Sequence, residues 1–270
     1  MNYSENFGCS DMKTTKPYKL YHWDRVDVLK EVAQYGVVQI MSPPKTPDAF
    51  LNFLASLGSL MFTEGEIPVT GHPLLNVVTN ANRKTKPKST FHSDTSYISR
   101  PPSNSALIAI EVPKAGGATL FSDQYAALDS LDDDLRTLLQ GAEVLHTATG
   151  VQKVQSEWHP LVRYNPQSGR KALFLTSIAR CKRLRLADGT DRTDLLQDLY
   201  DVSLTNTPHI KHDWSLGDVL LWDNRCTMHA ADHSDVHGTR TLFRGLIRGE
   251  KPICGGAVDL RDGGVATSHI

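Results

Sequence analysis

The sequence lacks a long hydrophobic run and an excess of charge of either sign. No apolar stretch approaches the ~20 residues that a membrane-spanning helix needs. Lys and Arg total 29 and Asp and Glu total 30, so the formal net charge is −1. This balance gives no electrostatic reason to expect nucleic acid or an anionic membrane as a partner. Residues 1–19 are polar and lack the apolar core of a signal peptide, so we expect a cytoplasmic protein.

Cysteine is also scarce, and its spacing excludes the common thiol motifs. The four cysteines, Cys9, Cys181, Cys226 and Cys254, form no CxxC pair, so a zinc finger or a thioredoxin-like motif is not supported. Cys226 lies three residues before His229. A site for a softer metal would need more than this one thiolate, so we expect reduced thiols throughout.

The remaining composition is that of a folded enzyme. Hydrophobic residues make up 40% and charged residues 22% of the 270 residues, as in soluble globular proteins. No internal repeat, low-complexity tract or linker divides the chain. All-β barrels and sandwiches of this length often fold as one unit, so we expect a single domain over residues 1–270.

The hydrophobic periodicity predicts a mainly β protein with surrounding helices. Helical spacing indicates helices over 24–35, 46–57, 123–140 and 190–200. Short β-like runs punctuated by turn residues indicate strands over 36–40, 105–112, 118–121, 209–214, 218–222, 226–230 and 239–247. Such short strands with helices packed outside favour a β-sandwich or jelly roll.

A histidine and a carboxylate, His92 and Asp94, are two residues apart. On an extended strand, alternate side chains point to the same face, so both can reach one ion. A second imidazole, His229, lies far downstream. Two histidines and one carboxylate form the facial triad of non-haem Fe(II) oxygenases, which leaves positions open on the metal. The HxD pair alone predicts little in a chain with 11 histidines.

Two further residues stand at set distances from this triad. Thr119 follows Asp94 by 25 residues, and Arg240 follows His229 by 11 residues. A 2-oxoglutarate molecule that chelates iron through its keto acid projects a second carboxylate away from the metal. A guanidinium offers that carboxylate a bidentate fork and a threonine offers it a hydroxyl. Either residue alone would be interpreted as a surface arginine or a strand threonine, but together they favour a co-substrate site.

The sequence closely resembles the TauD/TfdA family of 2-oxoglutarate-dependent dioxygenases. The resemblance runs from about residue 71 to about residue 252. It is carried by the following stretches: Phe91–Asp94 with Pro101-Pro102, Pro113–Phe121, His159–Arg163 with Gly169–Phe174, and Gly217–Arg225 leading through His229 to Arg240 and Arg244.

The resemblance implies a double-stranded β-helix (jelly roll) core and a lid-like insertion within about 123–208. It implies that His92, Asp94 and His229 bind Fe(II), and that Thr119 and Arg240 hold the distal carboxylate of 2-oxoglutarate. Family members that act on anionic substrates often carry a substrate-contacting arginine four residues after the co-substrate arginine, and Arg244 occupies that position here. Lys88 stands where taurine-oxidising members have an asparagine, and it is the second position expected to contact substrate. The departure at that second position argues against taurine itself.

The implied reaction is the O2-dependent oxidation of a small, anionic organic substrate, by hydroxylation or a related oxidation, with release of succinate and CO2. Two other classes stay open: a metal-dependent enzyme that is not an oxygenase, and a binding module, both on a cupin-like barrel. The first would not need the pair Thr119 and Arg240, and the second would tolerate loss of the metal-ligating residues, which are all present. Arg240 and Arg244 share one face of a strand, so Arg244 either waits for a substrate anion or pairs with an acidic side chain of the protein. The oligomeric state, including a homo-oligomer, is left open.

Overall fold

The computed structural model describes residues 14–24, 26–81, 89–149 and 154–255. Its larger sheet has the strand order β2-β3-β15-β7-β17-β6-β5, with β4 paired to β17. The strands of this sheet are β2 (Tyr18–Leu20), β3 (Val37–Ile40), β4 (Leu60–Met61), β5 (Pro68–Val69), β6 (His72–Thr79), β7 (Pro102–Glu111), β15 (Val219–Asp223) and β17 (Thr241–Arg248). Every pairing in it is antiparallel except that of β2 with β3.

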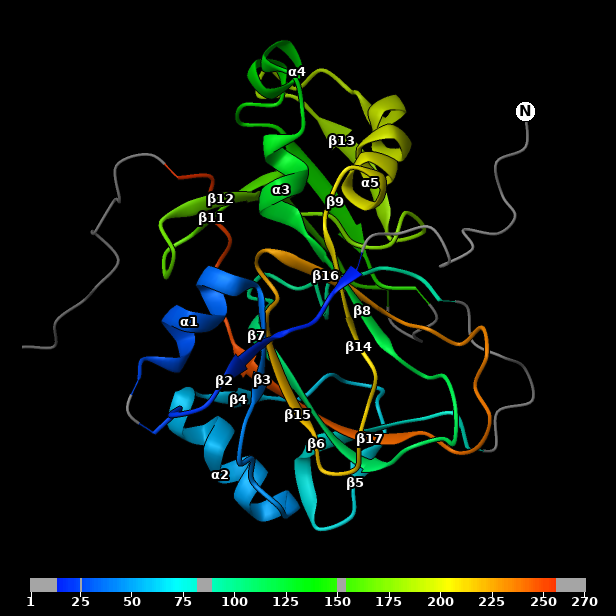
Figure 1. Ribbon diagram of the computed structural model, residues 1–270. Helices are drawn as coiled ribbons and strands as arrows, with labels where there is room; N and C mark the ends of the chain where they lie inside the picture. The colour runs from blue at the N-terminus through cyan, green and yellow to red at the C-terminus, as the bar shows by residue number, and fades with distance from the viewer. Residues whose placement is uncertain (1–13, 25, 82–88, 150–153, 256–270) are drawn as a thin grey trace, which may run out of the picture.

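A second sheet of order β1-β14-β8-β16 faces the first (Figure 1). It consists of β1 (Thr14–Thr15), β8 (Thr119–Asp123), β14 (His209–His212) and β16 (Thr227–Ala231). The apolar layer between the sheets joins Phe121 of β8 to side chains of the larger sheet, among them Leu107, Trp222 and Leu242. This layer buries the inward face of both sheets, and β15 is apolar from Val219 to Trp222 because Val219 and Leu221 point to the opposite face and are buried in a second core.

Two helices cover the outer face of the larger sheet: α1 (Val28–Tyr35) and α2 (Pro47–Leu57). The Asp27 carboxylate accepts a hydrogen bond from the Lys30 amide and so caps α1, and Gly36 ends it with φ 76°. Thr46 caps α2 in the same way, with Pro47 at its first position. The predicted ends of this second helix are confirmed.

The described residues between β8 and β14 form a cluster of helices and small strands at the end of the molecule opposite α2, at the top of Figure 1. Its elements are α3 (Gln124–Asp129), α4 (Asp133–Leu138), β9 (Glu143–Thr147), β10 (Ser156–Pro160), β11 (Val162–Asn165), β12 (Arg170–Leu173), β13 (Cys181–Arg185), η1 (Thr193–Leu195) and α5 (Leu196–Thr205). Its apolar core also includes Phe91 and, from β16, Met228 and Ala230. This cluster is therefore packed against the strand that carries His229.

The single helix predicted over residues 123–140 is wrong, because the chain breaks it into α3 and α4. Ser130 ends the first helix, and the Asp132 carboxylate accepts from the Leu135 amide to begin the second. The apolar spacing continues through the break because Leu128, on α3, and Leu131, in the break, are buried in the same core.

Among the described residues, no helix is both long enough and apolar enough to cross a membrane. Cys181, Cys226 and Cys254 are free thiols, as expected.

Candidate metal centre

The backbone pairs His92 directly with His229. The His92 amide donates to the His229 carbonyl at 3.0 Å, and the His229 amide donates to the His92 carbonyl at 2.9 Å. His229 lies on β16, whereas His92 lies in the segment between β6 and β7. The predicted strand through His92 and Asp94 is wrong in its second half, because the chain turns at Asp94 and Thr95 adopts φ 44°. The turn nevertheless brings the carboxylate to the two imidazoles.

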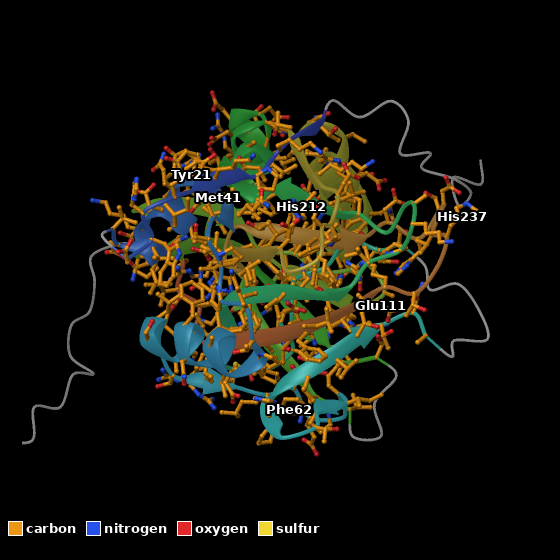
Figure 2. All side chains as sticks on the ribbon, turned by 60° about the horizontal axis from the view of Figure 1, so that its bottom comes forward. Tyr21, Met41, Phe62, Glu111, His212 and His237 are labelled. Carbon is orange, nitrogen blue, oxygen red and sulfur yellow. The ribbon has the colours of Figure 1, made fainter. Side chains whose placement is uncertain are left out.

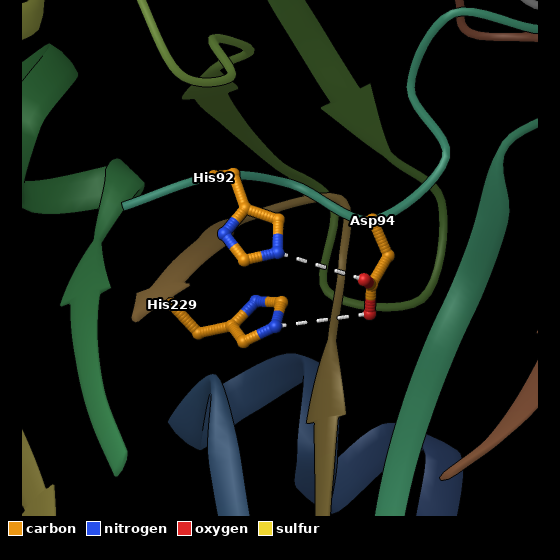
Figure 3. A group of neighbouring side chains, drawn as sticks. All are labelled: His92, Asp94 and His229. Carbon is orange, nitrogen blue, oxygen red and sulfur yellow. Dashed lines mark ion pairs between the residues drawn. The ribbon is translucent and has the colours of Figure 1, made fainter. Parts of the chain in front are cut away.

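The side chains of His92, Asp94 and His229 converge on one point (Figure 3). Nε2 of His92 lies 3.9 Å from Oδ1 of Asp94, and Nε2 of His229 lies 3.9 Å from Oδ2. Within the part of the chain that the structure describes, these three offer ligand atoms that all lie within 4.8 Å of one another. Two imidazoles and one carboxylate at this spacing suit a divalent first-row metal and leave its other positions free.

The hydrogen bonds and pKa values of these residues fit a bound cation. His92 Nδ1 donates to the Thr90 carbonyl at 3.0 Å, which leaves Nε2 as the acceptor facing Asp94. Burial lowers the pKa of His92 and lowers that of His229 to about 3, so both imidazoles stay neutral and able to bind metal. Although burial raises it, the pKa of Asp94 stays well below its usual value because Arg244 and the two histidines favour the anion. Asp94 is 2% exposed, and its Oδ2 atom has no hydrogen-bond partner among the described residues.

Asn224 fixes the backbone of Asp94 from the turn that precedes β16. Its Oδ1 accepts from the Asp94 amide at 2.8 Å, and its Nδ2 donates to the carbonyls of Asp94 and Pro102, both at 3.1 Å. One amide side chain therefore ties the carboxylate ligand to the turn that leads into the strand carrying His229. Asn224 belongs to a stretch that resembles the TauD/TfdA family, but no role was predicted for it from the sequence.

The second predicted pair, Thr119 and Arg240, is brought together beside this cluster. Arg240 Nε donates to the Gly117 carbonyl at 2.8 Å, and its Nη2 donates to Thr119 Oγ1 at 3.0 Å. Arg240 is 3% exposed, and no carboxylate of the described residues lies within 4.0 Å of it. Burial lowers the pKa of Arg240 to about 10, so the group is still charged at neutral pH. A buried guanidinium without a counter-ion is a site for an anion.

Trp214, which sequence reasoning missed, sets the direction of the Thr119 hydroxyl. Its indole Nε1 donates to Thr119 Oγ1 at 3.0 Å. This oxygen also accepts from Arg240. A hydroxyl has two acceptor lone pairs and one proton, so its proton is left to donate to a third group. An indole in a loop carries no local sequence signal for such a contact.

The loops that hold Arg240 and Thr119 are packed against each other. Ala115, which precedes β8, forms an isolated bridge with His237, which precedes β17. Figure 2 shows His237 and Glu111 on the same side of the molecule. A Cβ at Gly116 would lie 1.8 Å from the Asp235 carbonyl oxygen, so only glycine fits there.

Arg244 lies on β17 beside the metal ligands and has internal partners. Nη1 donates to Asp94 Oδ1 at 2.7 Å, Nη2 donates to Glu66 Oε1 at 3.2 Å and Nε donates to Asn76 Oδ1 at 3.2 Å. Of the two alternatives expected for this arginine, these contacts match pairing with acidic side chains of the protein. Lys88 lies outside the described residues.

Fold and ligand cluster together define a jelly-roll protein with a site suited to a divalent metal. The model of the taurine catabolism dioxygenase TauD, TfdA family matches residues 2–246, and the chain belongs to this family. The expected fold class, mainly β with a jelly-roll core, is confirmed.

Several relatives of similar sequence are named as alpha-ketoglutarate-dependent dioxygenases. The chain is 34% identical over 170 residues to an alpha-ketoglutarate-dependent 2,4-dichlorophenoxyacetate dioxygenase of Cupriavidus pinatubonensis, covering 57% of this chain and 58% of the relative. It is 28% identical over 180 residues to an (S)-phenoxypropionate/alpha-ketoglutarate dioxygenase of Sphingobium herbicidovorans, covering 59% and 62%. It is 30% identical over 187 residues to an alpha-ketoglutarate-dependent sulfate ester dioxygenase of Pseudomonas putida, covering 60% of each. The matched stretches thus span about three fifths of these relatives.

Solved structures of similar fold include a taurine dioxygenase and AAD-2. A taurine dioxygenase from Burkholderia xenovorans superimposes with a TM-score of 0.70 at 25% identity, over 90% of this chain and 91% of the other. The crystal structure of AAD-2 in complex with Mn(II) and N-oxalylglycine superimposes with a TM-score of 0.67 at 25% identity, over 84% and 90% of the chains.

Proposed function

We propose that this protein is an Fe(II)- and 2-oxoglutarate-dependent oxygenase that oxidises a small, anionic organic substrate and releases succinate and CO2. The observation that carries the proposal is Arg240, a buried guanidinium without a carboxylate partner among the described residues, placed beside a cluster of two histidines and one aspartate. A metal-dependent enzyme that is not an oxygenase, or a binding module, would have no use for this charge.

In this proposal His92, Asp94 and His229 hold the iron, which supplies the O2 chemistry when bound. The protein's own residues position the reactants. Thr119 and Arg240 bind the distal carboxylate of 2-oxoglutarate. Because Trp214 and Arg240 both donate to Thr119 Oγ1, the hydroxyl proton of Thr119 is available to donate to that carboxylate. Bidentate guanidinium contacts fix direction as well as charge, so the keto acid would be held with its other end toward the metal ligands.

An anionic substrate is supported by the names of the relatives, which specify a phenoxyacetate, a phenoxypropionate and a sulfate ester. We further propose that the insertion within about 123–208 covers one side of the site, since Ser93, between two of the proposed metal ligands, donates to the Leu175 carbonyl within that insertion. Arg244 as a substrate contact stays a prediction, as do a cytoplasmic location and the oligomeric state.

The test uses purified protein with Fe(II) and 2-oxoglutarate under anaerobic conditions. We expect the weak visible charge-transfer band of a chelated keto acid, and its loss in His92→Ala, Asp94→Ala and His229→Ala. His237→Ala is the matched control, because that imidazole is exposed and pairs with Asp235 away from the cluster. Mn(II) binding followed by electron paramagnetic resonance gives a second readout. A band that persists in all three ligand variants would contradict the metal assignment.

With O2 admitted, succinate formation is then measured against a panel of small carboxylates, sulfonates and sulfate esters. We expect at least one anionic compound to stimulate succinate release above the rate seen without substrate. Stimulation confined to neutral compounds would contradict the proposed substrate class.

A further inference from the structure

Arg180, which is half-buried, is a second arginine without a carboxylate partner among the described residues. Of the arginines in the described ranges that are buried or half-buried, only Arg180 and Arg240 have no carboxylate within 4.0 Å. Arg163, Arg225 and Arg244, for example, each pair with an acid at 2.7 or 2.8 Å. Since Arg240 is explained by the co-substrate, Arg180 is the cation that the proposed function leaves unused.

The backbone of Arg180 is fixed by hydrogen bonds. Its amide donates to the Ser177 carbonyl at 2.7 Å, and its carbonyl accepts from the Thr147 amide at 2.9 Å. Its side chain donates from Nε to Thr149 Oγ1 at 3.1 Å, which leaves the terminal nitrogens of the guanidinium with no hydrogen bond to a described residue. The charged end of this side chain is therefore held in place but available.

The segment that carries Arg180 is anchored to the metal-ligand segment. Ser93, between the two ligands His92 and Asp94, donates from Oγ to the Leu175 carbonyl at 2.8 Å. Thr176 Oγ1 donates in return to the Ser93 carbonyl at 3.3 Å. These two bonds place the turn at residues 177–180 next to the proposed iron site.

The guanidinium itself lies beside Tyr97, three residues after Asp94. The Arg180 Cζ atom is 5.8 Å from the centre of the Tyr97 ring. The charges of Arg180 and Arg244 both oppose the burial that raises the pKa of Tyr97. Arg180 thus acts on one of the same side chains as Arg244, which borders the metal ligands directly.

We propose that Arg180, together with the hydroxyl of Tyr97, forms the subsite that binds the anionic group of the substrate, a carboxylate, sulfonate or sulfate. The proposal rests on the proposed function and adds the residue that selects the substrate. A planar guanidinium with free donors suits each of these oxyanions. The Tyr97 hydroxyl has no hydrogen-bond partner in the described part of the chain and supplies a neutral donor. The charge of Arg244, by contrast, is already shared between Asp94 and Glu66.

The experiment compares ligands of equal shape that differ in charge. Protein loaded with Mn(II) and 2-oxoglutarate is titrated calorimetrically with three pairs: 2,4-dichlorophenoxyacetate and its amide, 2-phenoxypropionate and its amide, and an alkyl sulfate and the matching alcohol. We expect the wild-type protein to prefer at least one anion over its neutral partner. Arg180→Ala should weaken that anion about tenfold or more, the usual effect of removing a charge-assisted hydrogen bond, and leave the neutral partner unchanged. Arg180→Lys should keep part of the preference.

Arg183→Ala is the matched control. This substitution removes the same charge from the same insertion as Arg180→Ala does. Arg183, however, is exposed and pairs with Asp191 at 2.8 Å. It should leave the preference for the anion intact. Binding of 2-oxoglutarate to the Mn(II)-loaded protein, measured first for each variant, should also be unchanged in Arg180→Ala.

The outcomes separate this inference from the proposed function. Wild-type protein that fails to bind 2-oxoglutarate refutes the proposed function. Protein that binds 2-oxoglutarate but prefers none of the three anions refutes the subsite. Equal weakening of anion and neutral partner in Arg180→Ala would mean a structural role. A preference that survives in Arg180→Ala but disappears in Arg244→Lys would assign the anion to Arg244 instead.

Discussion

Replacing Arg240 by alanine should separate the binding of 2-oxoglutarate from the stability of the protein. In the unliganded protein Arg240 makes two hydrogen bonds, to Gly117 and Thr119, while its charge is buried without a counter-ion. Arg240→Ala removes those bonds but also removes the unpaired buried charge, and the two effects have opposite signs. The free energy of unfolding of the unliganded protein should therefore change little.

The loss of co-substrate affinity should be large by comparison. Truncating one partner of a buried, hydrogen-bonded charge pair costs ~2–5 kcal/mol, much of it from the anion left unpaired. At ~1.4 kcal/mol per factor of ten, the dissociation constant of 2-oxoglutarate should rise from about 30-fold to several thousand-fold. Mn(II) affinity should stay near the wild-type value, because Arg240 is not among the three side chains that converge on the metal point.

Calorimetric titration of the Mn(II)-loaded protein measures the affinity directly, and denaturant unfolding with and without 2-oxoglutarate measures the linkage. At 100 times its dissociation constant the co-substrate should stabilise the wild-type protein by ~2.7 kcal/mol, and the same concentration should stabilise Arg240→Ala by ~0.9 kcal/mol or less. Arg248→Ala, an exposed arginine at the other end of β17, is the control. Unchanged 2-oxoglutarate affinity in Arg240→Ala would refute the reasoning, whatever happens to stability.

Three further predictions concern single side chains. Thr119→Val should weaken 2-oxoglutarate by at most roughly 1.5–3 kcal/mol, less than Arg240→Ala does; calorimetry that shows the reverse order would contradict the assigned roles. Asn224→Ala leaves the Asp94 amide without its partner, so it should cost about 1–3 kcal/mol in denaturant unfolding and also weaken Mn(II) binding; an unaltered Mn(II) affinity would rule out a positioning role. Burial lowers the pKa of His146 to about 3, so the unfolded chain binds a proton there first as the pH falls below about 6.5, and stability should fall by up to ~1.4 kcal/mol per pH unit. His146→Phe should therefore lose stability less steeply between pH 6.5 and 4 in metal-free protein, and equal slopes would show that other groups control acid unfolding.

The sequence predicted the parts of the fold and site that depend on local chemistry. The second helix was placed correctly because Thr46 and Pro47 mark its start. The three metal-ligand side chains were found because the spacing of His92 and Asp94, with a distant histidine, matches a known ligand set.

Contacts between distant segments left no such signal. Arg244 donates hydrogen bonds to Glu66 and Asn76, which lie 178 and 168 residues away in the sequence. The position of Arg244 on β17 therefore could not show whether its guanidinium was free. Trp214 reaches Thr119 across 95 residues. The break between α3 and α4 was missed for a different reason, since the leucine spacing is helical on both sides and only the capping carboxylate of Asp132 marks the restart.

The register of β8 against β16 sets the length of the diacid that can reach from the metal ligands to Thr119. His229 pairs with Phe121 and Ala231 pairs with Thr119, so the threonine lies on the face of the metal ligand, two residues further along. Two residues of antiparallel strand measure about 6.8 Å, a span fixed by the backbone and not by any adjustable side chain. A keto diacid one carbon shorter, anchored at the metal, would fall roughly one bond length, about 1.5 Å, short of Thr119. Selection for a five-carbon diacid would thus be built into the sheet itself, and a shift of one pair in this register would abolish it.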